Sequence, residues 1–136
     1  MALVSHFSTA VDPELALQAE VAALNRQFDG ADAQTVLRAA IEEQYADEIA
    51  LVSSFGADSA VLLHMVSQIN PDVPVVFVDT GKLFPATLRY RDELVTRFVF
   101  SDVRSQRPLK EDLASEDPAG MLWMSDTDAC CHVRKV

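Results

Sequence analysis

The chain has 136 residues, of which 11 are Lys or Arg and 21 are Asp or Glu, so its formal net charge is −10. This acidic excess argues against broad binding to nucleic acid or to anionic membranes, whose phosphates it would repel. The length and a hydrophobic fraction of 49% are those of one globular domain, and no run of 18 apolar residues predicts a membrane span. Residues 1–6 lack the basic region and apolar core of a secretory signal, so we expect a cytoplasmic location.

Helical patterns fill residues 1–47, which we expect to form an N-terminal helical layer within a single domain of residues 1–136. The run Asp12-Pro13-Glu14 combines an N-cap, a proline at the first helical position and an acid in the first turn. A second helix is expected from about residue 33 to 46. Apolar residues at helical spacing predict buried stripes, which are Leu17, Val21, Leu24 and Phe28 in the first helix, and Val36, Leu37, Ala40, Ile41 and Tyr45 in the second.

The rest of the chain alternates strand and helix patterns. Short apolar runs at 49–52, 75–78 and 98–100 predict strands, the first of them buried on both faces, and helical patterns at 58–69 and 85–97 separate them. This alternation predicts the α/β class, with a parallel sheet and helices on both faces. Further helices are expected near 109–114 and from just before Cys130, the latter capped by Asp126 or Asp128.

The loop after the first strand is a candidate anion site. The first N–H groups of a helix have no partner within it and carry the positive end of its dipole, which favours a phosphate or sulfate there. The candidate residues are Ser53, Ser54, Phe55, Gly56, Ala57, Asp58 and Ser59; the glycine permits close approach and the serines supply hydroxyl donors. The loop has neither the Gly-Lys-Ser/Thr of a Walker loop nor three glycines for a dinucleotide. An ordinary strand–helix connection capped by Ser and Asp is the alternative.

A second candidate loop, Asp79-Thr80-Gly81-Lys82-Leu83, follows the next strand. The carboxyl ends of parallel strands meet at one edge of a sheet, where ligands bind in open α/β folds. Asp79 and Thr80 could contact a ribose, Gly81 permits close approach, and Lys82 could meet an anion. A capping turn with an exposed lysine is the alternative.

Both cysteines are adjacent, at Cys130 and Cys131, and neighbours are poorly placed to form a disulfide with one another. The pair therefore indicates a metal or a cluster, with His132 as a third ligand if the metal were zinc. Arg134 and Lys135 would offset the charge of thiolates. Two ordinary cysteines without a ligand are the alternative.

Three motifs together resemble one enzyme family. Residues 53–64 resemble the modified PP-loop of the adenylyl-sulfate and phosphoadenylyl-sulfate reductases, residues 78–87 resemble their second loop, and residues 128–136 resemble their cluster-binding motif. The resemblance implies an adenine nucleotide α-hydrolase-like fold and reduction of adenylyl sulfate to sulfite and AMP in assimilatory sulfate reduction. A cysteine thiolate of such enzymes attacks the sulfate sulfur, and thioredoxin or glutaredoxin then releases sulfite.

The same resemblance implies a role for the cysteine pair. Cys130 and Cys131 would be two of the four ligands of a [4Fe-4S] cluster, Lys135 would tune it, and adenylyl sulfate would be the substrate. The family's other two ligands and its nucleophilic cysteine lie in later segments that this sequence lacks. We therefore expect a truncated, N-terminal part of such an enzyme, with no catalytic residue of its own and no activity alone.

Two other functions compete with this one. The first is an ATP-splitting PP-loop enzyme such as a sulfate adenylyltransferase small subunit, from which the Ser-Phe-Gly-Ala-Asp-Ser run departs. The second is a nucleotide-binding or assembly module without catalysis, which would form a homo-oligomer through a sheet edge or through the apolar residues 121–124.

Overall fold

The computed structural model describes residues 12–135, so the expectation about residues 1–6 lies outside the described part. Its contacts divide the chain into two compact units, residues 1–36 and 37–136. The division falls inside a helix, whereas the predicted helical layer runs to residue 47. All of the candidate site residues belong to the second unit. None of the helices in the described residues is long and apolar enough to cross a membrane.

The first unit contains α1 (Pro13–Gln27) and the start of α2 (Ala33–Arg38). The predicted N-cap of α1 is confirmed, because Asp12 Oδ1 accepts a hydrogen bond from Glu14 N at 3.0 Å. The predicted burial of its apolar stripe is wrong, since α1 has no buried residue and both Leu17 and Val21 are exposed. Helical spacing shows which side chains share a face, but burial needs a second surface to cover that face.

The second unit begins at the end of α2, which continues as a π-helical segment, η1 (Ala39–Gln44), in place of the single α-helix expected. Tyr45 N donates to Ala40 O at 3.1 Å, which is the five-residue spacing of a π-helix. Ile41 is buried as predicted, whereas Tyr45 is exposed.

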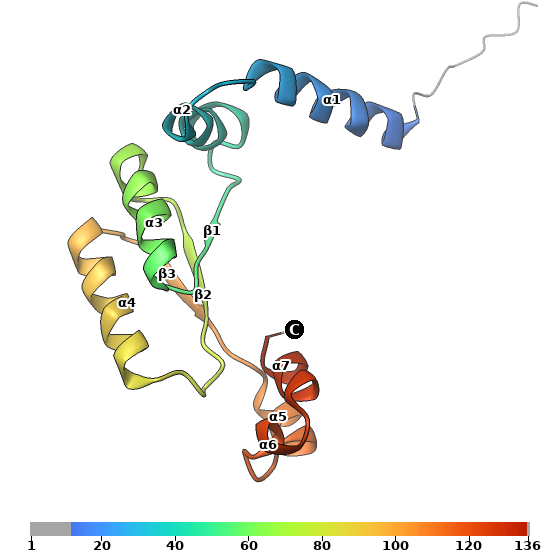
Figure 1. Cartoon of the computed structure of the whole chain (residues 1–136), viewed down its shortest axis with the longest axis vertical. Helices are drawn as coiled ribbons and strands as arrows, with labels where there is room; N and C mark the ends of the chain where they lie inside the picture. Colours follow the sequence, from blue (N-terminus) through green and yellow to red (C-terminus); the bar gives the residue numbers. More distant parts are fainter. Residues whose placement is uncertain (1–11, 136) are drawn as a thin grey trace, which may run out of the picture. The chain divides into compact units, whose positions relative to one another are not determined.

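A three-stranded parallel sheet in the order β1-β2-β3 organises the second unit (Figure 1). Its strands are β1 (Leu51–Val52), β2 (Val75–Val78) and β3 (Val103–Gln106). Leu51 pairs with Val75, and Val75 pairs in turn with Val103. The predicted α/β class with a parallel sheet is confirmed.

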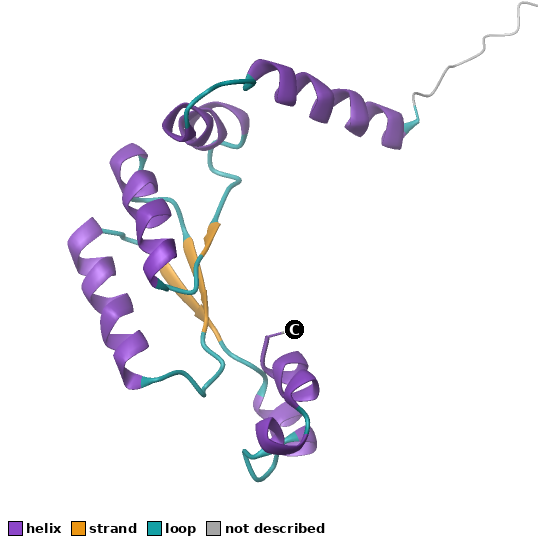
Figure 2. Ribbon diagram, viewed as in Figure 1, coloured by secondary structure: helices purple, strands orange, loops and turns teal. Residues whose placement is uncertain are grey.

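Two crossover helices connect the strands, α3 (Ala57–Ile69) after β1 and α4 (Pro85–Phe98) after β2. Figure 2 shows both on the same side of the strands. Right-handed crossovers that move in one direction across a parallel sheet place their helices on the same face. We expected helices on both faces of the sheet, and these two cover one of them.

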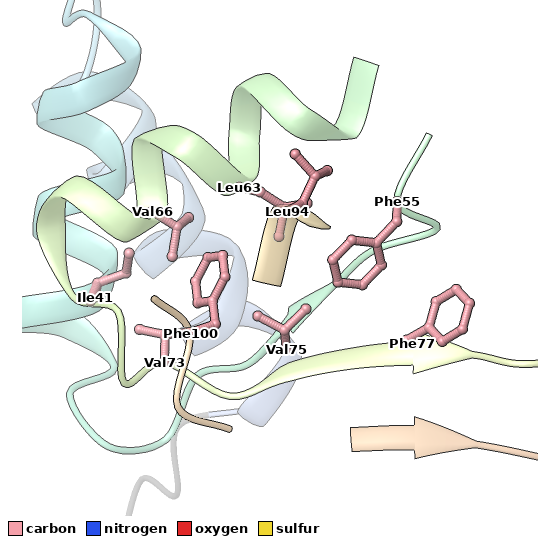
Figure 3. Close-up of a cluster of buried hydrophobic side chains, with 9 residues drawn as sticks. All are labelled: Ile41, Phe55, Leu63, Val66, Val73, Val75, Phe77, Leu94 and Phe100. Carbon is pink, nitrogen blue, oxygen red and sulfur yellow. The ribbon is translucent and has the colours of Figure 1, made fainter. Parts of the chain in front are cut away.

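The hydrophobic core lies between that face and the two helices (Figure 3). Val75 and Phe77 alternate with half-buried Val76 and Val78 along β2, as a period of two requires. The buried members of the cluster are Ile41, Phe55, Leu63, Val66, Val73, Val75, Phe77, Leu94 and Phe100.

Two predicted strands differ from the structure. The first was expected to be buried on both faces, but β1 has two residues and Val52 is 69% exposed. The third was expected at 98–100, which is wrong: Phe98 ends α4, Val99 is its left-handed C-cap, and Phe100 packs into the core. The strand lies at Val103–Gln106, where one side chain is half-buried and the other three are exposed.

Three short helices complete the chain, α5 (Lys110–Glu116), α6 (Leu122–Ser125) and α7 (Thr127–Lys135). Contacts join α7 to both α5 and α6. The predicted cap of the last helix is confirmed at Asp126, whose Oδ1 accepts a hydrogen bond from Ala129 N at 2.9 Å. The cysteine pair therefore lies in the middle of α7.

Candidate functional site

The loop of residues 53–59, here called the first loop, joins the end of β1 to the start of α3. Gly56 is the N-cap of α3 and offers no side chain to bond its first N–H groups. The Ser54 and Ser59 hydroxyl oxygens lie 3.4 Å apart beside this helix start. Gly56, Ala57 and Asp58 are exposed, so this end of α3 is open to an anion.

Phe55 and Ser53 give the first loop its shape. Phe55 has a φ of +53° and is fully buried, with its ring edge-on to Phe77 at 5.5 Å between centroids. Ser53 is also buried, and its Oγ accepts a hydrogen bond from Phe55 N at 3.1 Å. A left-handed phenylalanine is strained, and core packing holds it there. Both residues thus act inside the protein, and Ser54, Gly56 and Ser59 form the open surface of the loop.

The loop of residues 79–83, here called the second loop, follows β2 at the same edge of the sheet. Asp79 is only 3% exposed, and its Oδ1 accepts a hydrogen bond from Gly81 N at 3.0 Å. Thr80 Oγ1 accepts one from Lys82 N at 3.2 Å, and Gly81 has a φ of +70°, which suits glycine. The side chains of Asp79 and Thr80 therefore shape the loop from within.

Lys82 has a partner inside the protein. Its Nζ donates to the Gly120 carbonyl oxygen at 2.6 Å, across 38 residues of sequence. A Cβ at Gly120 would lie 3.2 Å from this nitrogen, and the φ of +66° there also favours glycine. Lys82 thus fastens the second loop to the segment between α5 and α6.

Arg107 is a site residue that the sequence analysis did not select. Its Nε donates to Asp79 Oδ2 at 2.9 Å, and a second nitrogen, Nη2, lies 2.8 Å from the same oxygen. The pKa of Asp79 is held below its ordinary value, first by the hydrogen bond from Gly81 N and then by Arg107, against the effect of burial. Asp79 N also bonds Gln106 O at 2.8 Å, so the strand register brings Arg107 to this loop.

Arg134 and Asp117 form a buried ion pair that the sequence analysis also missed. Arg134 Nη2 donates to Asp117 Oδ2 at 2.5 Å, and both side chains are less than a tenth exposed. Arg134 Nη1 donates to the Thr80 carbonyl oxygen at 2.9 Å. The pKa of Asp117 is lowered, chiefly by the hydrogen bond from Arg134, and the pKa of Arg134 is raised, chiefly by the same bond. The pair connects α7 to the second loop.

The cysteines face different surroundings. Cys130 is 7% exposed and lies one turn before Arg134, whereas Cys131 is exposed and lies one turn before Lys135. Thiols are the ligand type that iron–sulfur clusters use, but such clusters need four of them. Within residues 12–135, no group of three His, Cys, Asp or Glu could hold a metal. The described residues thus match a cluster in ligand type and fall short of it in ligand number.

A cavity of about 420 Å³ opens beside the second loop. Its lining combines the loop with two cations and several apolar side chains: Asp79, Thr80, Gly81, Leu83, Leu88, Arg107, Pro108, Lys110 and Leu113. A smaller cavity of about 230 Å³ shares Arg107 and extends to Arg134 and Lys135. A cavity of about 630 Å³ runs along α4 from Tyr90 to Arg97 and touches neither loop.

The structure therefore brings some of the candidate residues together. Both loops lie at the carboxyl ends of neighbouring strands, and the contact of Phe55 with Phe77 joins their bases. One hydrogen bond, from Arg134 Nη1 to the Thr80 carbonyl oxygen, connects the second loop to α7, and among the described residues none connects the first loop to α7. Arg107 and Asp117 carry no sequence motif that distinguishes them from surface charges. Arg134 lies in the motif of residues 128–136, but its bonds to Thr80 and Asp117 were not predicted.

Comparison with known proteins bears on this arrangement. Residues 48–136 match the family model described as the phosphoadenosine phosphosulfate reductase domain. An adenosine 5'-phosphosulfate reductase of Mesorhizobium japonicum is 46% identical over 92% of this chain and 49% of its own length. Another from a Chelativorans species is 43% identical over 88% of this chain and 50% of its own.

Relatives with the other substrate in their names are almost as similar. A phosphoadenosine 5'-phosphosulfate reductase of Xanthomonas oryzae pv. oryzae is 42% identical over 84% of this chain and 48% of its own length. The chain spans about half the length of the curated relatives it matches. The family match covers both loops and the cysteine pair, so the resemblance of the three motifs is confirmed, and the chain belongs to the phosphoadenosine phosphosulfate reductase family.

Proposed function

We propose that this chain supplies the nucleotide-binding part of a reductase that converts adenylyl sulfate to sulfite and AMP. The family implies sulfate reduction on a nucleotide. The observation that carries the proposal is the open N-terminus of α3, where Gly56 leaves the first N–H groups without a side-chain cap and two serine hydroxyls lie beside them. Such a site suits the phosphate–sulfate end of the substrate.

The nucleoside end would lie against the second loop. In the structure the side-chain oxygens of Asp79 and Thr80 accept hydrogen bonds within the protein, so we assign them the role of shaping the loop. The cations at the rim of the 420 Å³ cavity are left to face a ligand: Lys110, and Arg107, whose side chain is 72% exposed although its Nε and Nη2 contact Asp79. These cations give the cavity a local positive charge, which can attract an anion although the net charge of the protein is −10.

Adenylyl sulfate is the proposed substrate in preference to its 3'-phosphorylated form. Support comes from the adjacent cysteines, which resemble the motif of cluster-containing family members, and from the relatives at 46% and 43% identity that carry this substrate in their names. The relatives at about 42% carry the other substrate in their names, so a binding competition is the deciding test.

The complete reaction is a proposal for the full-length protein. A cysteine thiolate attacks the sulfate sulfur, and AMP leaves with the bridging oxygen. The two thiols of thioredoxin then reduce the S-sulfonate, which releases sulfite, restores the enzyme cysteine and leaves thioredoxin with a disulfide. We propose that Cys130 and Cys131 give two thiolate ligands to a [4Fe-4S] cluster there, with Lys135 beside Cys131, and that the remaining ligands come from another segment. A cytoplasmic location and a role in cysteine biosynthesis belong to the same proposal.

The assembly module remains the second candidate function because one observation favours it. Met121, Trp123 and Met124 are all more than half exposed on and beside the short helix α6. Exposed apolar side chains of this size are typical of contact surfaces. Light scattering would show whether the chain is a monomer or a homo-oligomer, and nucleotide binding without sulfite production would fit this role.

Titration calorimetry with AMP, adenylyl sulfate and 3'-phosphoadenylyl sulfate tests the proposal. We expect adenylyl sulfate to bind, and the variants Ser54→Ala and Ser59→Ala each to weaken its binding about tenfold, because each removes one hydrogen bond to a charged group. Ser67→Ala is the matched control, since Ser67 lies at the other end of α3 and donates to His64 O. Equal affinity in the wild type and all three variants, or no binding to any of them, would show that the first loop does not bind the nucleotide.

A further inference from the structure

The Arg134 side chain connects three segments that are far apart in the sequence. It belongs to α7, donates to the Thr80 carbonyl oxygen across 54 residues, and donates to Asp117 across 17. The distances are 2.9 Å and 2.5 Å, and the residue is 7% exposed. A guanidinium holds such partners in a fixed fork geometry, which a lysine cannot reproduce. The second loop, the end of α5 and α7 are therefore fixed to one another by one charged group.

This guanidinium also lies beside a cysteine. Cys130 precedes Arg134 by four residues on α7, so the two side chains share a face of the helix, and both residues are only 7% exposed. Arg134 Nε is buried and has no hydrogen-bond partner among residues 12–135. A buried donor without a partner is costly and uncommon, and here it belongs to a group next to a buried thiol.

The second loop is shaped around the same arginine. Gly81 has a φ of +70°, and a Cβ there would lie 3.7 Å from Arg134 Nη1. The loop backbone therefore runs directly over the guanidinium, and a change in the conformation of the loop moves or releases the Thr80 carbonyl. Since that carbonyl and Asp117 hold Arg134 in place, such a change would reach the face of α7 that carries Cys130.

We propose that Arg134 is a positioning residue that couples the nucleotide-binding second loop to the accessibility of Cys130. The inference rests on the proposed function, because it needs a nucleotide that orders the second loop. A ligand that orders the loop holds Arg134 against Thr80 and Asp117, keeps α7 docked and shields the Cys130 sulfur. Because the docked state of α7 both hides Cys130 and accompanies nucleotide binding, modification of Cys130 should in turn weaken nucleotide binding.

Alkylation of the reduced, metal-free protein by iodoacetamide tests the coupling. Tandem mass spectrometry separates modification at Cys130 from that at Cys131, and exposed Cys131 serves as the internal control. We expect saturating AMP to slow alkylation of Cys130 relative to Cys131 by about fivefold or more, as a coupling of typical size requires. In the Arg134→Lys variant, AMP should leave the ratio of the Cys130 and Cys131 alkylation rates unchanged. Arg104→Lys is the control, since Arg104 lies on β3 and forms an exposed ion pair with Asp102, away from the second loop and α7.

The outcomes separate this inference from the proposed function. If AMP does not bind to the wild-type chain, both fail. If AMP binds and the Cys130 rate stays the same, the coupling alone is wrong, and the same holds if Arg134→Lys responds to AMP as the wild type does. Asp117→Asn serves where Arg134→Lys does not fold: it retains an acceptor for Leu122 N, weakens the bond to Arg134, and should give a smaller response to AMP than the wild type.

Discussion

Individual charges matter most where the second loop meets α7. Asp117 accepts hydrogen bonds from Arg134 and from Leu122 N, so it binds a cation and caps a turn at once. Asp79 likewise accepts hydrogen bonds from a cation, Arg107, and from a backbone group of its own turn, Gly81 N. Each carboxylate is buried and each has a pKa below its ordinary value, which means that the folded state prefers both of them ionised.

The first prediction concerns stability in acid. The lowered pKa of Asp117 contributes stability that is present above the ordinary carboxyl pKa of 3.8 and is lost as the pH falls through the folded-state value. Asp117→Asn should therefore be less stable than the wild type at neutral pH, and should lose less further stability on acidification to about pH 3. Urea midpoints measured across this range check the expectation. Asp112→Asn on α5 is the control. Identical pH profiles of stability for Asp117→Asn and the wild type would contradict the expectation for Asp117.

The second prediction concerns a strained residue. Val99 is the left-handed C-cap of α4, with a φ of +59° and an exposed side chain. A β-branched residue in this conformation costs about 1–3 kcal/mol, whereas glycine adopts it without strain but loses more entropy on folding. Val99→Gly should therefore stabilise the protein by about 1 kcal/mol in urea denaturation. Val99→Ala keeps the strain of a Cβ and should gain much less; equal gains would assign the effect to the lost side chain.

Sequence reasoning at the residue scale reached the loops but not their internal contacts. The first loop was predicted from local features, namely a strand end, a glycine and serines next to a helix start. The bonds of Arg134 and of Lys82 span 54 and 38 residues, and nothing in the local sequence marks either partner. Arg107 was missed for the same reason, because its partner Asp79 comes from another strand end. Long-range partners follow from tertiary packing, which a single sequence does not give.

The elements of the second unit depend on one apolar layer. Phe55 is the member of this layer that belongs to the first loop, and it is fully buried against Phe77. Its ring thus fixes the loop to β2. A loop that carries its own core residue is positioned by packing as well as by its ends.

The third prediction tests this attachment. Phe55→Ala should destabilise the second unit by about 3–5 kcal/mol, the usual cost of removing a buried aromatic ring. Phe84→Ala is a matched control at the start of α4, because Phe84 is 79% exposed and its loss should cost less than about 0.5 kcal/mol. Thermal unfolding of the two variants checks the contrast. A similar effect in both would show that Phe55 does not hold the loop as described.

At the scale of elements, the longest helices were predicted well and the strands less well. Helices α1 and α7 begin next to the predicted caps Asp12 and Asp126, and α3 and α4 begin within one residue of the helical patterns expected at 58–69 and 85–97. The third strand was misplaced because Phe98, Val99 and Phe100 form an apolar run that serves the end of α4 and the core. The true strand, Val103–Gln106, is mostly polar because its side chains are largely exposed, so it gives no hydrophobic signal.

At the scale of the molecule, the candidate site consists of two loops at one edge of a parallel sheet. The family match confirms the family and the fold class that the three motifs implied. The chain covers about half the length of its relatives, so we propose the reductase reaction for the full-length protein and nucleotide binding for this part of it. Nucleotide binding is therefore the property of this chain that should be measured first.

The most direct measurement is a titration of the ¹⁵N-labelled chain with AMP, followed by amide chemical shifts. The account predicts that the largest changes fall in residues 53–59 and 79–83, the two loops, with little change along Tyr90 to Arg97, where a cavity of about 630 Å³ touches neither loop. Saturation without shifts in the two loops, or shifts concentrated on α4, would contradict it.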